Sequence, residues 1–85
     1  MSKREKLIKR FLSEPTDFTF HEMCLLLSYY GFYLCNNGRT SGSSVSFYRK
    51  EDNVVIRFHK PHPGNILKQY VLRDVKKMLE QNGYM

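Results

Sequence analysis

The stretch from residue 44 to residue 59 constrains the fold more than any other part of the chain. Apolar and polar side chains alternate through residues 44–49 and again through 54–59, and the turn between them is Lys50-Glu51-Asp52-Asn53. Alternation with period two on both sides of a polar turn predicts a β-hairpin with one buried and one wet face. The expected buried face comprises Val45, Phe47, Val54, Ile56 and Phe58, and the wet face Ser44, Ser46, Tyr48, Val55, Arg57 and His59.

Three other segments have the apolar spacing of helices. Residues 3–12 form one, and a capping box made by Thr19 and Glu22 begins a second that runs to Tyr30, where Gly31 ends it. A third covers residues 69–81. The expected buried stripes are Leu7, Ile8, Phe11 and Leu12, then Phe20, Met23, Cys24, Leu27 and Tyr30, then Leu72, Val75, Met78 and Leu79, with Phe18 packed on Met23 before the second helix.

The order of these elements predicts the fold class. With Phe32–Cys35 as one more strand, the chain reads helix, helix, three strands, helix. This indicates one α+β domain over residues 1–85, a small three-stranded antiparallel sheet with helices packed on one face. Residues 18–84 form the core and residues 1–13 an extra basic helix. Without that helix the order is α-β-β-β-α, the order of the double-stranded-RNA-binding domain (dsRBD).

Charge favours a polyanionic partner. The formal net charge is +6, and residues 1–13 hold five Lys or Arg against one Glu. Residues 39–85 hold nine against four acids, whereas residues 14–38 have three acids and no Lys or Arg. Basic segments at both ends suit a nucleic acid. The alternative is an ordinary small domain with solvated charges.

Several classes of protein are disfavoured by the same sequence. Cys24 and Cys35 are too few for a disulfide scaffold and lack the spacing of a zinc pair, so we expect both to be small buried side chains in a reducing cytoplasm. The longest apolar run, Met23 to Leu27, is too short to span a bilayer, and no signal-peptide core is present. We expect no metal, no membrane and no small-molecule cofactor.

Recurring short motifs then resemble those of the HicA family of RNA-cleaving toxins. The resemblance runs from about Phe18 to Tyr84. The motifs are Asp17-Phe18-Thr19-Phe20 before a leucine-rich helix, Gly31-Phe32, Gly42-Ser43, Val45 and Phe47, Lys60-Pro61-His62-Pro63-Gly64, Leu67-Lys68 and Asn82-Gly83-Tyr84. The resemblance implies a dsRBD-like fold, cleavage of mRNA without metal, and neutralisation by a HicB-type antitoxin protein.

Ser44 departs from the family pattern, in which Gly-Ser is usually followed by the catalytic histidine. Metal-independent RNA cleavage takes a proton from the 2′-hydroxyl and gives one to the leaving oxygen, and imidazole suits both steps. A serine hydroxyl does not exchange a proton at neutral pH without a base. Three interpretations remain: a member with weak or lost cleavage, a member whose base has moved, or a chain inactivated on purpose.

Two histidines are candidates for a relocated base. His59 would lie one strand over from Ser44, and His62 just beyond it, between Pro61 and Pro63. The simpler role for His62 is to fix its loop by hydrogen bonding. The residues expected to contact RNA are Arg39, Ser43, Tyr48, Arg57, Lys60, His62 and Lys68. For each cation the alternative is a solvated surface charge.

The sequence therefore favours a HicA-like toxin that binds mRNA and cleaves it without metal, with Ser44 at the catalytic position and His59 assisting. One alternative is a non-catalytic RNA-binding module of the same fold. The other is a domain that binds only protein, its charge matching an acidic partner.

Overall fold

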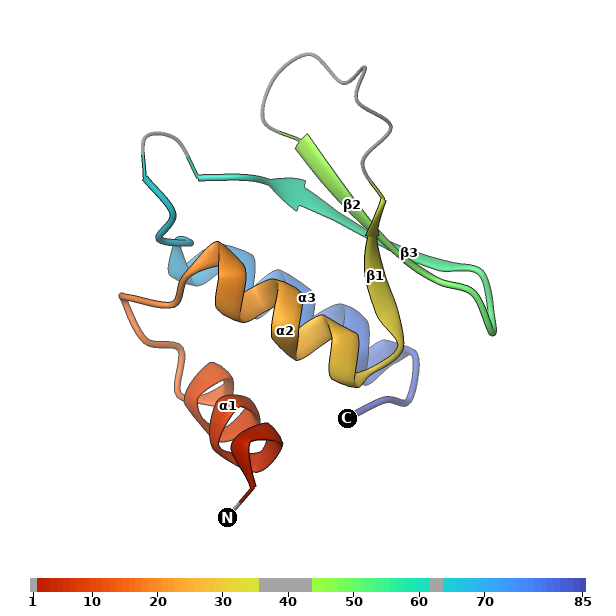
Figure 1. Cartoon of the computed structure of the whole chain (residues 1–85), viewed down its shortest axis with the longest axis horizontal. Coiled ribbons are helices and arrows are strands. Elements are labelled where there is room, and N and C mark those ends of the chain that lie inside the picture. Colours follow the sequence, from red (N-terminus) through yellow and green to blue (C-terminus); the bar gives the residue numbers. More distant parts are fainter. Residues whose placement is uncertain (1, 36–43, 62–63) are drawn as a thin grey trace.

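The three strands form one antiparallel sheet in the order β1-β2-β3 (Figure 1). The computed structural model describes residues 2–35, 44–61 and 64–85. Its elements are α1 (Lys3–Leu12), α2 (Phe20–Tyr29), β1 (Phe32–Cys35), β2 (Ser44–Arg49), β3 (Val54–His59) and α3 (Gln69–Gln81). This is the predicted α+β fold, with α2 ending one residue before the expected Tyr30. The predicted turn at Asn36-Asn37-Gly38 lies outside the described residues.

The hairpin register is the one that the alternation predicts. Phe47 lies opposite Ile56, and both side chains are 1% exposed. Val45 and Phe58 also face inward as a cross-strand pair, but they are half-buried instead of buried. They sit nearer the open end of the hairpin, where the ring of Phe58 packs against Phe20, itself only partly covered.

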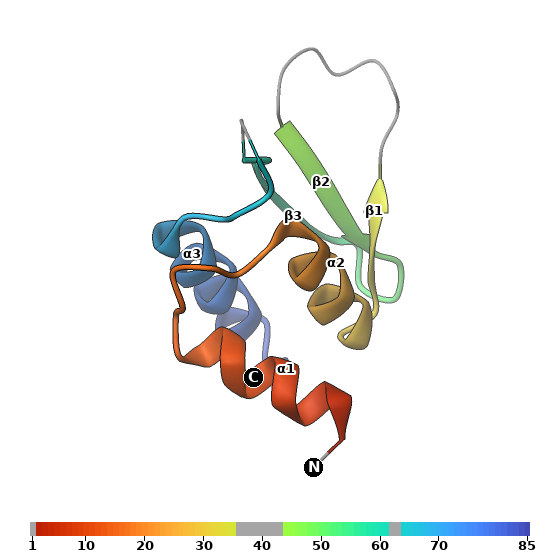
Figure 2. The ribbon, with the colours of Figure 1, turned by 60° about the vertical axis from the view of Figure 1, so that its left-hand side comes forward.

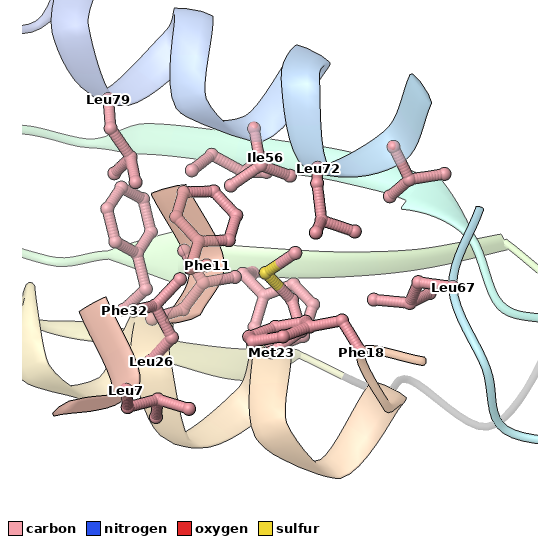
Figure 3. Packing of buried hydrophobic residues seen from close by; sticks show 14 residues of the cluster. Leu7, Phe11, Phe18, Met23, Leu26, Phe32, Ile56, Leu67, Leu72 and Leu79 are labelled. Carbon is pink, nitrogen blue, oxygen red and sulfur yellow. The ribbon is translucent and has the colours of Figure 1, made fainter. Parts of the chain in front are cut away.

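The helices cover one face of the sheet in two levels. Helices α2 and α3 lie side by side across the inner face, and α1 lies against this pair on the side away from the sheet (Figure 2). The buried apolar side chains between these levels form one cluster (Figure 3). Its members are Leu7, Phe11, Phe18, Met23, Leu26, Leu27, Phe32, Phe47, Ile56, Leu67, Val71, Leu72, Val75 and Leu79.

The two-level arrangement explains where the expected core was wrong. Leu26 is fully buried although it lies off the predicted stripe, because α2 is covered by the sheet on one side and by α1 on another. Leu12, expected inside, is 42% exposed in the last turn of α1, because it lies about 100° around the helix from the buried Phe11. Cys35, also expected inside, is exposed because its place in β1 points it to the outer face, and Cys24 is half-buried.

The starts of α2 and α3 are tied together by backbone pairing. The predicted capping box is present: the Thr19 hydroxyl accepts from the Glu22 N–H at 3.0 Å, and the Glu22 carboxylate accepts from the Thr19 N–H at 2.9 Å. Beside it, the Phe20 N–H donates to the Asn65 carbonyl and the Leu67 N–H to the Phe18 carbonyl. The segment after β3 is thereby held against the start of α2.

Ion pairs fix α1 and its linker to the other helices. The Arg10 guanidinium donates to both carboxylate oxygens of Glu22, at 2.8 and 3.1 Å, and to Asp17 at 3.0 Å. Mainly because of the bond from Arg10, the pKa of Glu22 falls to about 2. In the linker, Glu14 pairs with Arg73 of α3 at 2.7 Å.

The closed end of the hairpin is held by Arg49. Its Nε donates to the Tyr30 carbonyl at 2.7 Å, and its guanidinium pairs with Asp52 at 2.8 Å. The guanidinium also lies 4.5 Å from the centre of the Tyr84 ring, and the Tyr84 hydroxyl donates to Asp52. The open end, which begins with Ser44 and ends with His59, lies at the other end of the same strands.

Candidate functional site

The outer face of the sheet carries polar and aromatic side chains in three cross-strand rows. Ser44 is paired with His59, Ser46 with Arg57, and Tyr48 with both Val55 and Tyr33. The helices lie on the opposite face, so this surface is uncovered within the described chain (Figure 1). Neighbouring rows are separated by two residues of strand, about 7 Å.

Ser44 and His59 are direct partners at the open end of the hairpin. Directly opposed residues in an antiparallel pair have Cα atoms about 4.5 to 5.5 Å apart, with both side chains on the same face. The imidazole is exposed and the hydroxyl is half-buried. One small group bound here, such as a phosphodiester, could therefore contact both side chains.

Arg57 supplies the positive charge of the second row. Its Nε donates to the Ser46 hydroxyl at 3.0 Å, which holds the guanidinium over β2. Within the described residues it forms no ion pair, and its side chain is exposed. Its other guanidinium N–H groups have no acceptor among the described residues, and a planar guanidinium matches the geometry of a phosphate well.

The third row is aromatic. The rings of Tyr33 and Tyr48 meet edge to face with their centres 5.8 Å apart, and the Tyr48 hydroxyl donates to Asn53. Tyr33 is 51% exposed. Tyr33 was not among the predicted site residues, although the alternation along β1 puts its side chain on the outer face together with Cys35. Exposed tyrosine faces suit the stacking of unpaired bases.

Comparison with known protein families decides the identity. A family described as the HicA toxin of bacterial toxin–antitoxin systems matches residues 20–84. The chain belongs to the HicA toxin family. Comparisons with curated proteins and with solved structures gave no match. Membership implies that this HicA protein is the toxin of a toxin–antitoxin pair. The match begins with α2, so α1 and its linker lie outside it.

Two predicted contacts of this HicA protein lie away from the outer face. The Lys60 ammonium is 5.2 Å from the centre of the Phe20 ring, so its side chain turns toward the helical side of the sheet. Lys68 is exposed at the residue that precedes α3. Three further candidates, Arg39, Ser43 and His62, lie outside the described residues. The predicted residues that the structure brings together are Ser44, Tyr48, Arg57 and His59.

Two negative observations apply to the described part of this HicA chain. Over residues 2–35, 44–61 and 64–85, no three His, Cys, Asp or Glu side chains converge in a way that could hold a metal ion. None of the helices found there has the length and apolar character needed to cross a bilayer.

Proposed function

We propose that this HicA toxin binds mRNA in the cytoplasm along the outer face of its sheet and cleaves it slowly without metal. The observation that carries the proposal is the direct pairing of Ser44 with His59. An imidazole that shares a row with the family's catalytic position can reach the same phosphodiester. In the next rows Arg57 anchors a neighbouring phosphate, and Tyr33 and Tyr48 offer a stacking surface.

The proposed reaction is an internal transfer within the RNA. His59 takes the proton of a 2′-hydroxyl, whose oxygen forms a bond to the adjacent phosphorus. The bond from phosphorus to the 5′-oxygen breaks, and that oxygen takes a proton from water. The products are a 2′,3′-cyclic phosphate and a 5′-hydroxyl end. Ser44 donates a hydrogen bond to a non-bridging phosphate oxygen.

Ser44 accounts for the expected slow rate. One imidazole cannot serve as base and acid in the same step, and a serine hydroxyl does not replace the missing histidine. Loss of one positioned proton-transfer group costs about a hundredfold to ten-thousandfold in rate. Binding of RNA should persist, because Arg57 and the tyrosines do not depend on residue 44.

The test compares RNA cleavage in the presence of a chelator by the unaltered protein, Ser44→His and His59→Ala. Ser44→His should raise the rate by about a hundredfold or more, and His59→Ala should abolish what cleavage the unaltered protein shows. His21→Ala is the matched control, since His21 is exposed on α2 away from this face. Equal cleavage by His59→Ala and the unaltered protein would refute the role of His59.

Ser44 also favours a second function, RNA binding without cleavage. In that case the unaltered protein and His59→Ala would both leave RNA intact while binding it, with an affinity that falls as salt rises. Charge reversal with Arg57→Glu would weaken this binding. Absence of RNA binding at low salt by the folded protein would instead favour the interpretation that the domain binds only protein.

The antitoxin implied by the family is proposed to be a HicB-type protein that covers the outer face. Tyr33 and Val55, 51% and 43% exposed, are the apolar surface that such a contact would bury. Aromatic side chains are common at the centres of protein interfaces. Co-purification of the toxin with the product of the neighbouring gene would measure this contact, and Tyr33→Ser should reduce the amount recovered.

A further inference from the structure

Helix α1 carries a row of cations that neither the fold nor the proposed site uses. Lys3, Arg4, Lys6 and Lys9 are all exposed, and within the described residues none of them forms an ion pair. Arg10 is the cation of this helix that pairs with acids. The helix lies outside the residues matched by the HicA family and on the side of the molecule away from the sheet (Figure 2).

The helix is held rigidly, with its apolar face turned inward. Leu7 and Phe11 are 8% and 1% exposed in the common core, and the ring of Phe11 packs on Phe18 at 5.7 Å. Insertion into a membrane surface would need this apolar face, which is already buried. What α1 offers to a partner is therefore its charged side, fixed in orientation by the core and by the Arg10–Glu22 pair.

Helix stability does not account for the cations in the first two turns of α1. Lys3 and Arg4 occupy the first turn, where the helix dipole favours negative side chains. Lys6 lies three residues from both Lys3 and Lys9, so like charges are neighbours along one side. These placements disfavour the isolated helix by a small amount, whereas Lys9, in the last turn and four residues after Glu5, is favoured. An external anion would account for the positions of Lys3, Arg4 and Lys6.

We propose that the exposed side of α1 binds the phosphate backbone of RNA, as a second contact separate from the outer face of the sheet. The inference rests on the proposed RNA-binding function. A helix with four exposed cations against one exposed acid, Glu5, and without exposed aromatic side chains suits a regular polyanion. A protein partner would require an apolar centre, and here the exposed apolar residue is Leu12, at the end of the helix.

The position of α1 makes the contact depend on RNA length. The two surfaces face opposite ways on a molecule whose longest dimension is 39 Å. An RNA that reaches from one to the other follows a path on the order of 40 Å, which takes about a dozen nucleotides if the strand is stacked with the rise of about 3.4 Å that one strand of a duplex has. A shorter RNA can occupy one surface at a time.

The experiment replaces the three lysines of α1 with glutamine: Lys3→Gln, Lys6→Gln and Lys9→Gln. Glutamine has nearly the same helix propensity as lysine, so the helix should persist. The matched control is Lys50→Gln, Lys76→Gln and Lys77→Gln, which removes the same charge from the hairpin turn and α3. Affinity is measured by fluorescence anisotropy against salt with RNAs of about six and about thirty nucleotides, both non-cleavable through 2′-O-methylation.

For the long RNA, the α1 variant should reduce the salt slope by about 2, since each contact to a single strand contributes about 0.7. At about 0.1 M salt this corresponds to roughly a hundredfold weaker binding. The short RNA, bound on the sheet, should lose little, and the control variant should bind both RNAs much as the unaltered protein does.

The outcomes separate this inference from the proposed function. If the short RNA binds and the α1 variant leaves the long RNA unaffected, the α1 contact is refuted and the sheet site stands. Equal losses in the α1 and control variants would show a general charge effect and also refute it. If neither RNA binds the unaltered protein at low salt, the proposed function fails and the α1 contact fails with it.

Discussion

Replacing Glu22 with glutamine tests the link that holds α1 to α2. Arg10 donates to both oxygens of this carboxylate, and the pKa of Glu22 falls from 4.5 to about 2 mainly for that reason. Glutamine keeps the length of the side chain and an oxygen that can accept from the Thr19 N–H. Either glutamate or glutamine can occupy this position of a capping box. Glu22→Gln therefore removes the charge and leaves the helix cap.

The magnitude follows from the pKa and the exposure of the pair. A pKa lowered from 4.5 to about 2 corresponds to at most about 3.4 kcal/mol of folding free energy. Part of the effect comes from Thr19, whose contact glutamine retains, and the side chains of Arg10 and Glu22 are 35% and 26% exposed, so water screens them. We expect Glu22→Gln to lower the free energy of unfolding by about 1 to 1.5 kcal/mol at neutral pH.

The sign of the pH dependence is fixed by the lowered pKa. The carboxylate contributes its full stabilisation above its unfolded-state pKa, and this contribution is lost as the pH falls from about 4.5 toward 2. The difference between the unaltered protein and Glu22→Gln should therefore shrink over this range. Urea unfolding followed by circular dichroism, at neutral pH and at several acidic pH values, measures this difference in the free energy of unfolding.

Glu80→Gln is the control, because Glu80 is exposed on α3 and forms no ion pair within the described residues. It should change the free energy of unfolding by less than about 0.5 kcal/mol. A Glu22→Gln deficit that stays constant down to about pH 2 would refute the ion-pair reasoning. So would an equal deficit in the control.

Three further substitutions test the packing and the chemistry of single residues. Gly31→Ala should cost about 1 to 2 kcal/mol in denaturant unfolding, because φ at Gly31 is +87° and a Cβ would lie 3.1 Å from the Nε of Arg49. Phe47→Ala should cost about 3 to 5 kcal/mol, since the ring is 1% exposed in the core; a loss under about 1 kcal/mol would contradict the packing. Thiol labelling of the native protein should show a fast phase that Cys35→Ser removes, because Cys35 is exposed whereas burial raises the pKa of the Cys24 thiol.

Local patterns were sufficient to predict the elements and the hairpin. The period-two alternation predicted both faces of β2 and β3, and regular pairing on the two sides of the turn at residues 50–53 brings Ser44 opposite His59. The capping box at Thr19 located the start of α2. These features depend on residues close in sequence, where steric and hydrogen-bonding rules leave few alternatives.

Packing between distant segments could not be predicted in the same way. Leu26 is buried because α1 folds back over α2, and no pattern within α2 reports that. The pairing of Phe18 and Phe20 with residues 65–67 joins the start of the second helix to a segment far along the chain that has no helix or strand pattern. At the site, the sequence named Lys60 and Arg57 as expected RNA contacts, but it could not show that the Lys60 ammonium lies over the ring of Phe20, away from the outer face.

The common core contains residues that lie outside the part of the chain matched by the HicA family, because α1 packs against α2 and α3. A fragment cut to the matched residues 20–84 would lose Leu7, Phe11 and Phe18 from the shared core. It would expose the apolar surface that they cover on α2, Leu26 included, and exposed patches of this kind promote aggregation. Recombinant production of such a fragment should yield inclusion bodies, so any reduction of this toxin to a minimal domain has to retain its first helix.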